Sequence, residues 1–114
     1  MIFVTGPMFS GKEKCICDHL GMSHEEFEKN GIRDAETFVK REPMTEEELA
    51  ALADELSKKR VVIASEIGGG VISTDPAENH YRENAGRLAQ FLAARSDTTV
   101  RVLCGIPQVL KGEL

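Results

Sequence analysis

A short segment at the start of the chain has the residue types and spacing of a phosphate-binding loop. After an apolar strand predicted over residues 2–5, the spacing G-x-x-x-x-G-K runs from Gly6 to Gly11 and Lys12, and a helix is predicted to follow. Glycines let such a loop curl until successive backbone N–H groups point at one anion, while the helix dipole and the lysine add positive charge. Gly6, Ser10, Gly11 and Lys12 are therefore candidate cofactor-binding residues, and Lys12 is also a candidate catalytic residue.

The residue after Lys12 departs from this motif. Ser or Thr is expected there, because its hydroxyl binds Mg²⁺, but this chain has Glu13. A carboxylate beside the phosphates repels them unless a metal ion bridges the two groups. We interpret Glu13 as a candidate metal ligand and cofactor-binding residue, and we expect weakened triphosphate binding if no metal bridges it. The alternative, which Glu13 keeps open, is a glycine-rich turn that binds no ligand.

A second candidate carboxylate, Glu66, follows a β-branched apolar run at residues 61–64, as expected at the end of a buried parallel strand. Phosphate-binding proteins often keep a Mg²⁺-associated acid in this setting. The neighbouring glycines allow a ligand to come close. Glu66 is therefore the candidate for metal binding and catalysis, and Gly68 and Gly70 are candidates for cofactor binding. The alternative is an ordinary exposed carboxylate at a strand end.

Two arginines, Arg82 and Arg87, lie on a long helix that we predict to begin with Asp75 as N-cap and Pro76 as first residue. From this helix they reach phosphates, a partner subunit or solvent. We include both as candidate cofactor-binding residues, although their spacing alone does not separate these alternatives.

The chain has three cysteines, an odd number that is typical of free thiols in a reducing compartment. Cys15 and His19 share a helix face, with Cys17 nearby. No fourth ligand accompanies them, and a closed zinc site needs four. We therefore interpret these cysteines as ordinary buried residues rather than as a metal site.

These candidates require an alternation of strands and helices to bring them together. Strands are predicted at residues 2–5, 61–64 and 99–104, and helices at 11–20, 24–30, from 46 onward, and 76–95. Residues 32–42 fit either a helical stripe or a short edge strand. We predict a single α/β domain over residues 1–114, a small three-layer P-loop-type fold with a parallel sheet of three or four strands, and ligands at the carboxyl ends of the strands. Flexible segments are expected at residues 68–74 and in the C-terminal tail.

Composition excludes several classes of function. With 14 basic and 19 acidic residues the net charge is −5, which argues against general binding to nucleic acids. No apolar stretch approaches the ~20 residues of a membrane span. The N-terminus lacks the basic and apolar regions of a signal peptide, so we expect a cytoplasmic protein.

Three stretches give the chain a specific resemblance. They are residues 64–70 (A-S-E-I-G-G-G), 81–90 (Y-R-E-N-A-G-R-L-A-Q) and 105–111 (G-I-P-Q-V-L-K). In this order they resemble the S-N-E-V-G-x-G, F-R-D-x-A-G-R-x-N-Q and G-x-P-x-x-L-K motifs of the adenosylcobinamide kinase / adenosylcobinamide-phosphate guanylyltransferase family of cobalamin biosynthesis. The N-terminal strand and loop are similar too. The resemblance implies a P-loop fold that uses GTP or ATP with Mg²⁺ and associates as a trimer.

The family's two reactions are phosphorylation of adenosylcobinamide and transfer of GMP from GTP to the product. The second proceeds through a guanylylated histidine in an H-x-x-x-R-P-like stretch, and a D-C-L-T-x-W stretch supplies an acidic metal residue. Neither stretch occurs here, and His19, His24 and His80 match no such context. This chain is therefore similar to a shortened member that lacks the central segment, so we expect the GMP transfer to be absent.

Three functions follow as alternatives. The chain is a reduced enzyme that retains the kinase step, a non-catalytic nucleotide or corrinoid binder with a regulatory role, or an interaction subunit with an empty loop. A thin sheet with few covering helices leaves apolar surface open, so we also expect a homo-oligomer.

Overall fold

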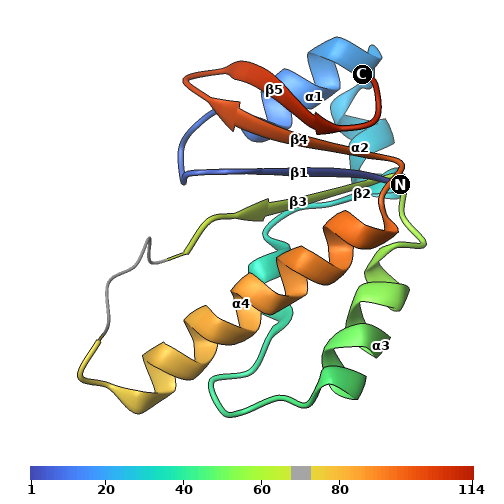
Figure 1. Ribbon diagram of the computed structural model, residues 1–114. Coiled ribbons are helices and arrows are strands. Elements are labelled where there is room, and N and C mark those ends of the chain that lie inside the picture. The colour runs from blue at the N-terminus through green and yellow to red at the C-terminus, as the bar shows by residue number, and fades with distance from the viewer. Residues whose placement is uncertain (68–72) are drawn as a thin grey trace.

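The structure, a computed structural model, describes residues 1–67 and 73–114, and these form a five-stranded sheet with helices on both faces (Figure 1). The elements follow in the order β1 (Ile2–Gly6), α1 (Lys12–Leu20), α2 (His24–Asn30), β2 (Gly31–Ile32), the 3₁₀ helix η1 (Ala35–Phe38), α3 (Glu46–Leu56), β3 (Val61–Ser65), α4 (Pro76–Arg95), β4 (Thr98–Leu103) and β5 (Ile106–Lys111).

The strand order is β2-β3-β1-β4-β5, and the first four strands run parallel. Ile2 lies in register with both Val61 and Thr98, so the carboxyl ends of β1, β3 and β4 meet at one edge of the sheet. The predicted three-layer α/β class is confirmed. The sheet, however, has more strands than the three or four expected, and it is mixed rather than wholly parallel.

The added strand β5 corrects the expectation of a flexible C-terminal tail. It pairs antiparallel with β4 through a two-residue turn, Cys104 and Gly105, whose φ angles are 52° and 74°. Positive φ at both positions suits the twist of a tight hairpin. β5 is the last strand of the sheet, and its Pro107 lies opposite Val102. The other segment expected to be flexible, residues 68–74, lies mostly outside the described residues.

The core consists of two layers, one on each face of the sheet. On one face Phe3 and Val62 pack with α3 and α4, where Leu88 is 1% exposed. On the other face Val4 and Ile16 pack with α1 and α2. Figure 1 shows these helix pairs on opposite sides of the strands. β3 is buried along residues 61–64, as predicted for a parallel strand covered on both faces.

Side-chain caps fix the starts of three helices. Ser23 and Glu26 form a capping box at α2, and Thr45 and Glu48 form a second at α3. Asp75 accepts from the N–H of Ala77 at the start of α4. The expected helix starts are confirmed here. Of the two structures considered for residues 32–42, the helical one is present as the 3₁₀ helix η1, whereas the short edge strand considered at residues 36–39 is not, and β2 lies earlier in the chain.

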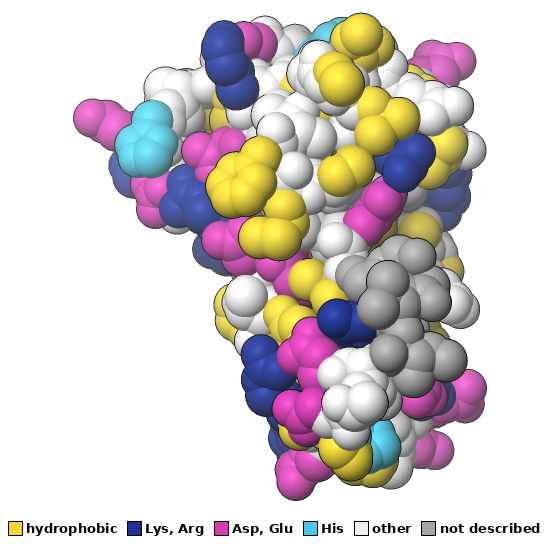
Figure 2. All heavy atoms as spheres, turned by 90° about the vertical axis from the view of Figure 1, so that its left-hand side faces the viewer, with side chains coloured by type: hydrophobic (Ala, Val, Ile, Leu, Met, Phe, Trp, Pro, Cys, Tyr) yellow, Lys and Arg dark blue, Asp and Glu magenta, His cyan; other side chains and the backbone are white. Residues whose placement is uncertain are grey.

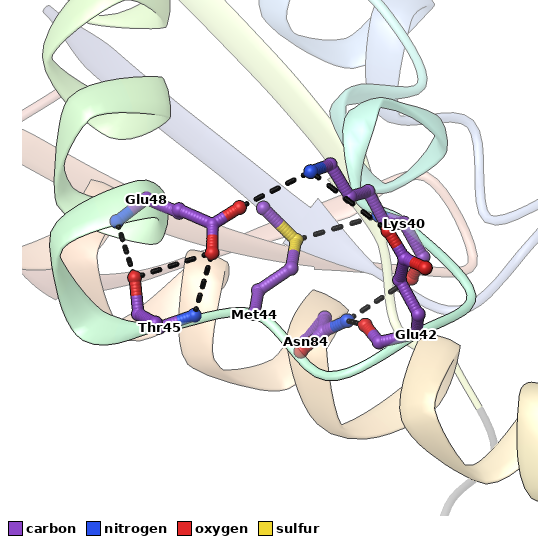
Figure 3. A network of polar contacts seen from close by, with 6 residues as sticks. All are labelled: Lys40, Glu42, Met44, Thr45, Glu48 and Asn84. Atoms are coloured by element: carbon purple, nitrogen blue, oxygen red, sulfur yellow. Dashed lines mark hydrogen bonds and ion pairs between the residues drawn. The ribbon is translucent and has the colours of Figure 1, made fainter.

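The loop before α3 is fastened to α4 (Figure 3). The Nδ2 of Asn84, which is 2% exposed, donates to the carbonyls of Lys40 at 3.0 Å and Glu42 at 2.8 Å. The backbone N–H of Lys40 donates to the Met44 sulfur, and the Nζ of Lys40 donates to Glu48 of the capping box. One buried amide therefore holds the segment that leads into α3.

Candidate functional site

The loop between β1 and α1 curls over the carboxyl edge of the sheet and is tied to two other loops. The Gly6 carbonyl accepts from the Glu66 N–H at 2.9 Å, and the Ser10 carbonyl accepts from the Gly105 N–H at 2.8 Å. Gly6 has a φ of 148°, and a Cβ there would lie 2.3 Å from the Val102 carbonyl oxygen, so a side chain does not fit. Gly11, at φ 83°, also has a conformation that favours glycine.

Lys12 folds back across this loop. Its Nζ donates to the Pro7 carbonyl at 2.7 Å, and the residue is only 8% exposed. Burial lowers the pKa of Lys12, while the nearby negative charges of Glu36, Asp34 and Glu66 oppose this shift. The ammonium group is thus held over the loop, with a backbone carbonyl as a partner that an anion can replace.

Ser10 supplies a second sign that the loop is built for a ligand. Its hydroxyl is buried and, within the described part of the chain, has no hydrogen-bond partner. Buried polar groups are normally hydrogen-bonded, so an unpartnered hydroxyl calls for an explanation. A phosphate oxygen in the loop would provide the missing partner.

Glu66 lies directly after β3 and is bound by an arginine that the sequence analysis did not select. Its two carboxylate oxygens accept from Arg101 Nε at 2.5 Å and Nη2 at 3.0 Å. These hydrogen bonds are the main cause of the lowered pKa of Glu66. The sequence signal that could have identified Arg101 is that it is the one charged residue in the strand T-T-V-R-V-L. Arg101 orients the carboxylate at the edge where the loops meet.

Glu36 is a second residue that the sequence analysis missed. It is 6% exposed, and its Oε1 accepts from the Ser65 N–H at 2.8 Å. Among the nearby negative charges, that of Glu36 also has the strongest effect in raising the pKa of Lys12. Glu36 belongs to η1, in the segment whose structure could not be assigned from periodicity, so no local signal placed it beneath the site.

Glu13 is held away from the loop by an ion pair. Its Oε1 accepts from Arg33 Nε at 2.7 Å, and Arg33 Nη2 also donates to Glu28 at 2.6 Å. The Arg33 guanidinium lies 5.0 Å from the centre of the Phe27 ring, and both carboxylates raise its pKa. The charge of Glu13 is therefore compensated within the protein, which weakens the repulsion of phosphates that we expected.

The carboxylates at the site provide a limited set of metal ligands. In the described part of the chain, no three His, Cys, Asp or Glu residues lie close enough together to hold a metal ion. Cys15, Cys17 and His19 therefore do not form such a group. Mg²⁺ that arrives with a nucleotide needs only one or two carboxylates besides phosphates and water. Glu66 fits that requirement better than Glu13, because its charge acts on Lys12 at the loop, whereas Glu13 is paired with Arg33.

The remaining candidates lie elsewhere or outside the described residues. Arg82 Nε donates to Glu78 at 3.2 Å. Arg87 Nη1 donates to the Met44 carbonyl at 3.4 Å, toward the start of α3 rather than toward the loop. Gly68 and Gly70 fall in the segment that is not described. The structure thus brings together Gly6, Ser10, Gly11, Lys12 and Glu66.

Two cavities flank the loop. One of about 280 Å³ is lined by Gly11, Lys14, Cys15, Asp18 and Gly105. The other, of about 190 Å³, lies between strand ends and α4 and is lined by Thr5, Ser65, Glu66, Ile67, Ala85, Gly86 and Ala89. Figure 2 looks onto this edge of the molecule and shows patches of hydrophobic side chains between charged ones. A phosphate on the loop would have a cavity on either side.

Comparison with known families gives a match over most of the chain. The model of the cobinamide kinase / cobinamide phosphate guanyltransferase family matches residues 15–110. The match begins after Lys12, so the phosphate-binding loop is supported by its own residues and geometry. A search of curated proteins found no match. Among the described residues, no helix has the length and apolar character needed to cross a membrane.

Proposed function

Since this chain belongs to the cobinamide kinase / cobinamide phosphate guanyltransferase family, we propose that it binds GTP or ATP with Mg²⁺ and retains the kinase step toward a corrinoid alcohol. The observation that carries this proposal is the loop itself. Lys12 is buried across it, and beside Lys12 the Ser10 hydroxyl is buried without a partner among the described residues.

The phosphates bind to the free N–H groups at the start of α1 and to Lys12. The first N–H groups of a helix have no acceptor within the helix and attract anions. Glu66, whose carboxylate is oriented by Arg101, would hold the metal ion. When bound, Mg²⁺ neutralises charge on the phosphate oxygens during transfer.

In the kinase step, the acceptor hydroxyl attacks the γ-phosphorus. A new O–P bond forms, the bond from the γ-phosphorus to the bridging oxygen breaks, and the nucleoside diphosphate leaves. The cavity beside Glu66 is placed to hold the acceptor. The hydroxyl proton is released to water. Catalysis of this kind rests mainly on position and charge.

The histidine-dependent GMP transfer is absent from this proposal. None of the chain's three histidines lines either cavity described above. His24, for example, lies on α2, 3.6 Å from Glu28. We therefore assign none of the described residues to a covalent guanylyl intermediate.

A second candidate is a nucleotide- or corrinoid-binding regulatory protein without turnover. The observation that favours it is Glu13, which replaces the hydroxyl that normally binds Mg²⁺ and is directed to Arg33. In this case nucleotide binds but no phosphate is transferred.

We also propose that the chain forms a homo-oligomer, a trimer by analogy with its family. β5 is exposed along its whole length, and Ile106 and Leu110 are 68% and 56% exposed. Exposed apolar side chains gathered on one hairpin are typical of an interaction surface.

The first test is titration calorimetry with GTP and with ATP, in the presence and absence of Mg²⁺. We expect Mg²⁺-dependent binding and at least about tenfold weaker binding by Lys12→Ala, because a charge-assisted hydrogen bond to phosphate is lost. Lys58→Ala, which alters an exposed lysine on the turn after α3, is the control. Unchanged affinity of Lys12→Ala would refute the loop assignment.

A second assay separates the two candidates. Transfer of labelled γ-phosphate to adenosylcobinamide is expected if the kinase step survives. Nucleotide binding without transfer would favour the regulatory protein.

A further inference from the structure

We propose that Arg101 is a catalytic residue of the phosphate transfer, and that its guanidinium binds the γ-phosphate and stabilises the charge that develops there. Arg101 lies outside the three stretches that resemble the motifs of the family, so this assignment comes from its place in the fold. The inference rests on the proposed kinase step and adds a residue that acts on the transferred group.

The strand order places Arg101 beside the strand that leads into the phosphate-binding loop. Arg101 on β4 is in register with Thr5 of β1, the residue before Gly6. Strand β1 lies between β3 and β4, and Glu66, the partner of Arg101, directly follows β3. The Arg101 side chain therefore crosses the carboxyl end of β1 to reach this partner. Its guanidinium lies where the loop begins.

Backbone contacts on both sides of β1 keep the start of the loop next to this ion pair. On the β3 side, the Glu66 N–H donates to the Gly6 carbonyl at 2.9 Å. On the β4 side, a Cβ on Gly6 would lie 2.3 Å from the carbonyl oxygen of Val102, the residue that follows Arg101. The first glycine of the loop is thus fixed between the two segments that carry the charges.

Glu66 orients the guanidinium and leaves part of it free. Nε and Nη2 donate to the two carboxylate oxygens at 2.5 Å and 3.0 Å, which fixes the plane of the group. A guanidinium has five N–H donors, and among the residues that the structure describes Nη1 has no acceptor. The side chain is 35% exposed, so a phosphate oxygen can reach Nη1. A carboxylate has about four acceptor positions, so Glu66 can hold Arg101 and a metal ion together.

The charges around the loop explain why a second cation is needed beside Lys12. Three carboxylates act on Lys12, those of Glu36, Asp34 and Glu66, and such charges repel an arriving phosphate. Arg101 compensates one of them. In phosphoryl transfer, an arginine of the same chain can stabilise the charge on the transferred group. The planar fork of a guanidinium suits phosphate oxygens better than the point charge of a lysine does.

The experiment measures the binding of GDP and of ADP by calorimetry, with Mg²⁺, in the presence and absence of aluminium fluoride. Aluminium fluoride mimics the transferred phosphoryl group, and mimics of a transition state bind more tightly than substrates. We expect it to raise the affinity of the wild type for the diphosphate by at least about tenfold. Arg101→Gln should lose this gain while it binds the diphosphate alone within about threefold of the wild type, because the contact is made with the transferred group.

Transfer of γ-phosphate to adenosylcobinamide provides the second readout. At saturating substrate, Arg101→Gln should be slower than the wild type by at least about 100-fold. Arg101→Lys, which keeps the charge without the fork, should lie between the two. If Arg101 only oriented Glu66 toward the metal ion, Arg101→Gln would instead weaken the Mg²⁺-dependent binding of the diphosphate alone.

The matched control is Arg95→Gln, which removes another arginine–carboxylate pair, with Asp54 at 2.6 Å, at the end of α4. It should keep both the gain and the transfer rate, and thermal unfolding checks that each variant is folded. If Arg101→Gln keeps the gain, or weakens the diphosphate alone as much as the mimic, the assignment of Arg101 is overturned while the kinase step stands. If the wild type shows neither the gain nor transfer, the proposed kinase step fails and this inference fails with it.

Discussion

At the scale of single residues, the Glu66–Arg101 pair links the site to pH. Because the folded-state pKa of Glu66 is lowered, the pair stabilises the fold above the unfolded carboxyl pKa of about 4.3, and this contribution is lost as pH falls through the lower folded-state value. We expect Glu66→Gln to lower the thermal midpoint at pH 6 to 7, and the difference from wild type to shrink below about pH 4. The effect is under about 1 kcal/mol, since the side chain is partly exposed.

Thermal unfolding between pH 3 and pH 7 measures this difference. Gln90→Ala, which replaces an exposed uncharged side chain on α4, serves as the control and should show no such trend. A Glu66→Gln difference that is the same at pH 3 and pH 7 would contradict the proposed contribution of the ion pair.

At the scale of elements, Asn84 joins α4 to the loop that leads into α3 (Figure 3). We expect Asn84→Ala to reduce the free energy of unfolding by about 1–3 kcal/mol, because two backbone carbonyls lose their donor in a buried place. Urea denaturation measures the change. Glu83→Ala, at the exposed neighbouring position on the same helix, should stay within about 0.5 kcal/mol of wild type. Equal stabilities of the two variants would show that Asn84 does not fasten the loop.

The elements that could be predicted are those with local signals. Each of these signals lies within a few residues of the chain: the loop glycines, the two capping boxes and the proline after Asp75. The structure has the turn or helix start that each of them predicts. β5 was missed because its start, Gly105-Ile106-Pro107, has the composition of a loop. Its pairing depends on the turn before it and on β4.

For the site, as for the elements, only the residues with a local sequence signal could be predicted. The positions of Lys12 and Glu66 follow from motif spacing and from the ends of strands. Glu36, Arg33 and Arg101 were not found, because each acts on a residue at least 20 positions away. Contacts between such distant residues depend on the order of the strands in the sheet. That order cannot be predicted from the spacing of residues along the chain.

At the scale of the whole molecule, the apolar hairpin predicts self-association. We expect light scattering to give a mass above the 12.5 kDa of one chain, about three times that value for a trimer. Ile106→Lys should shift the protein toward the monomer and leave each chain folded, because within one chain the side chain is 68% exposed. Phe38→Lys, at an exposed apolar position on η1, should leave the mass unchanged. A monomeric wild type at working concentration would refute the proposal.

The proline of β5 governs how such an assembly can grow. The pair Leu103 and Ile106 closes the hairpin, so the next residue along, Pro107, turns its nitrogen to the free outer edge of the sheet. That nitrogen carries no hydrogen, and a further strand laid along this edge would lack a donor at this point. Chains that meet at this hairpin are therefore expected to join through side chains rather than through a continued sheet. The strand-upon-strand stacking that leads to fibrils is discouraged at its first step.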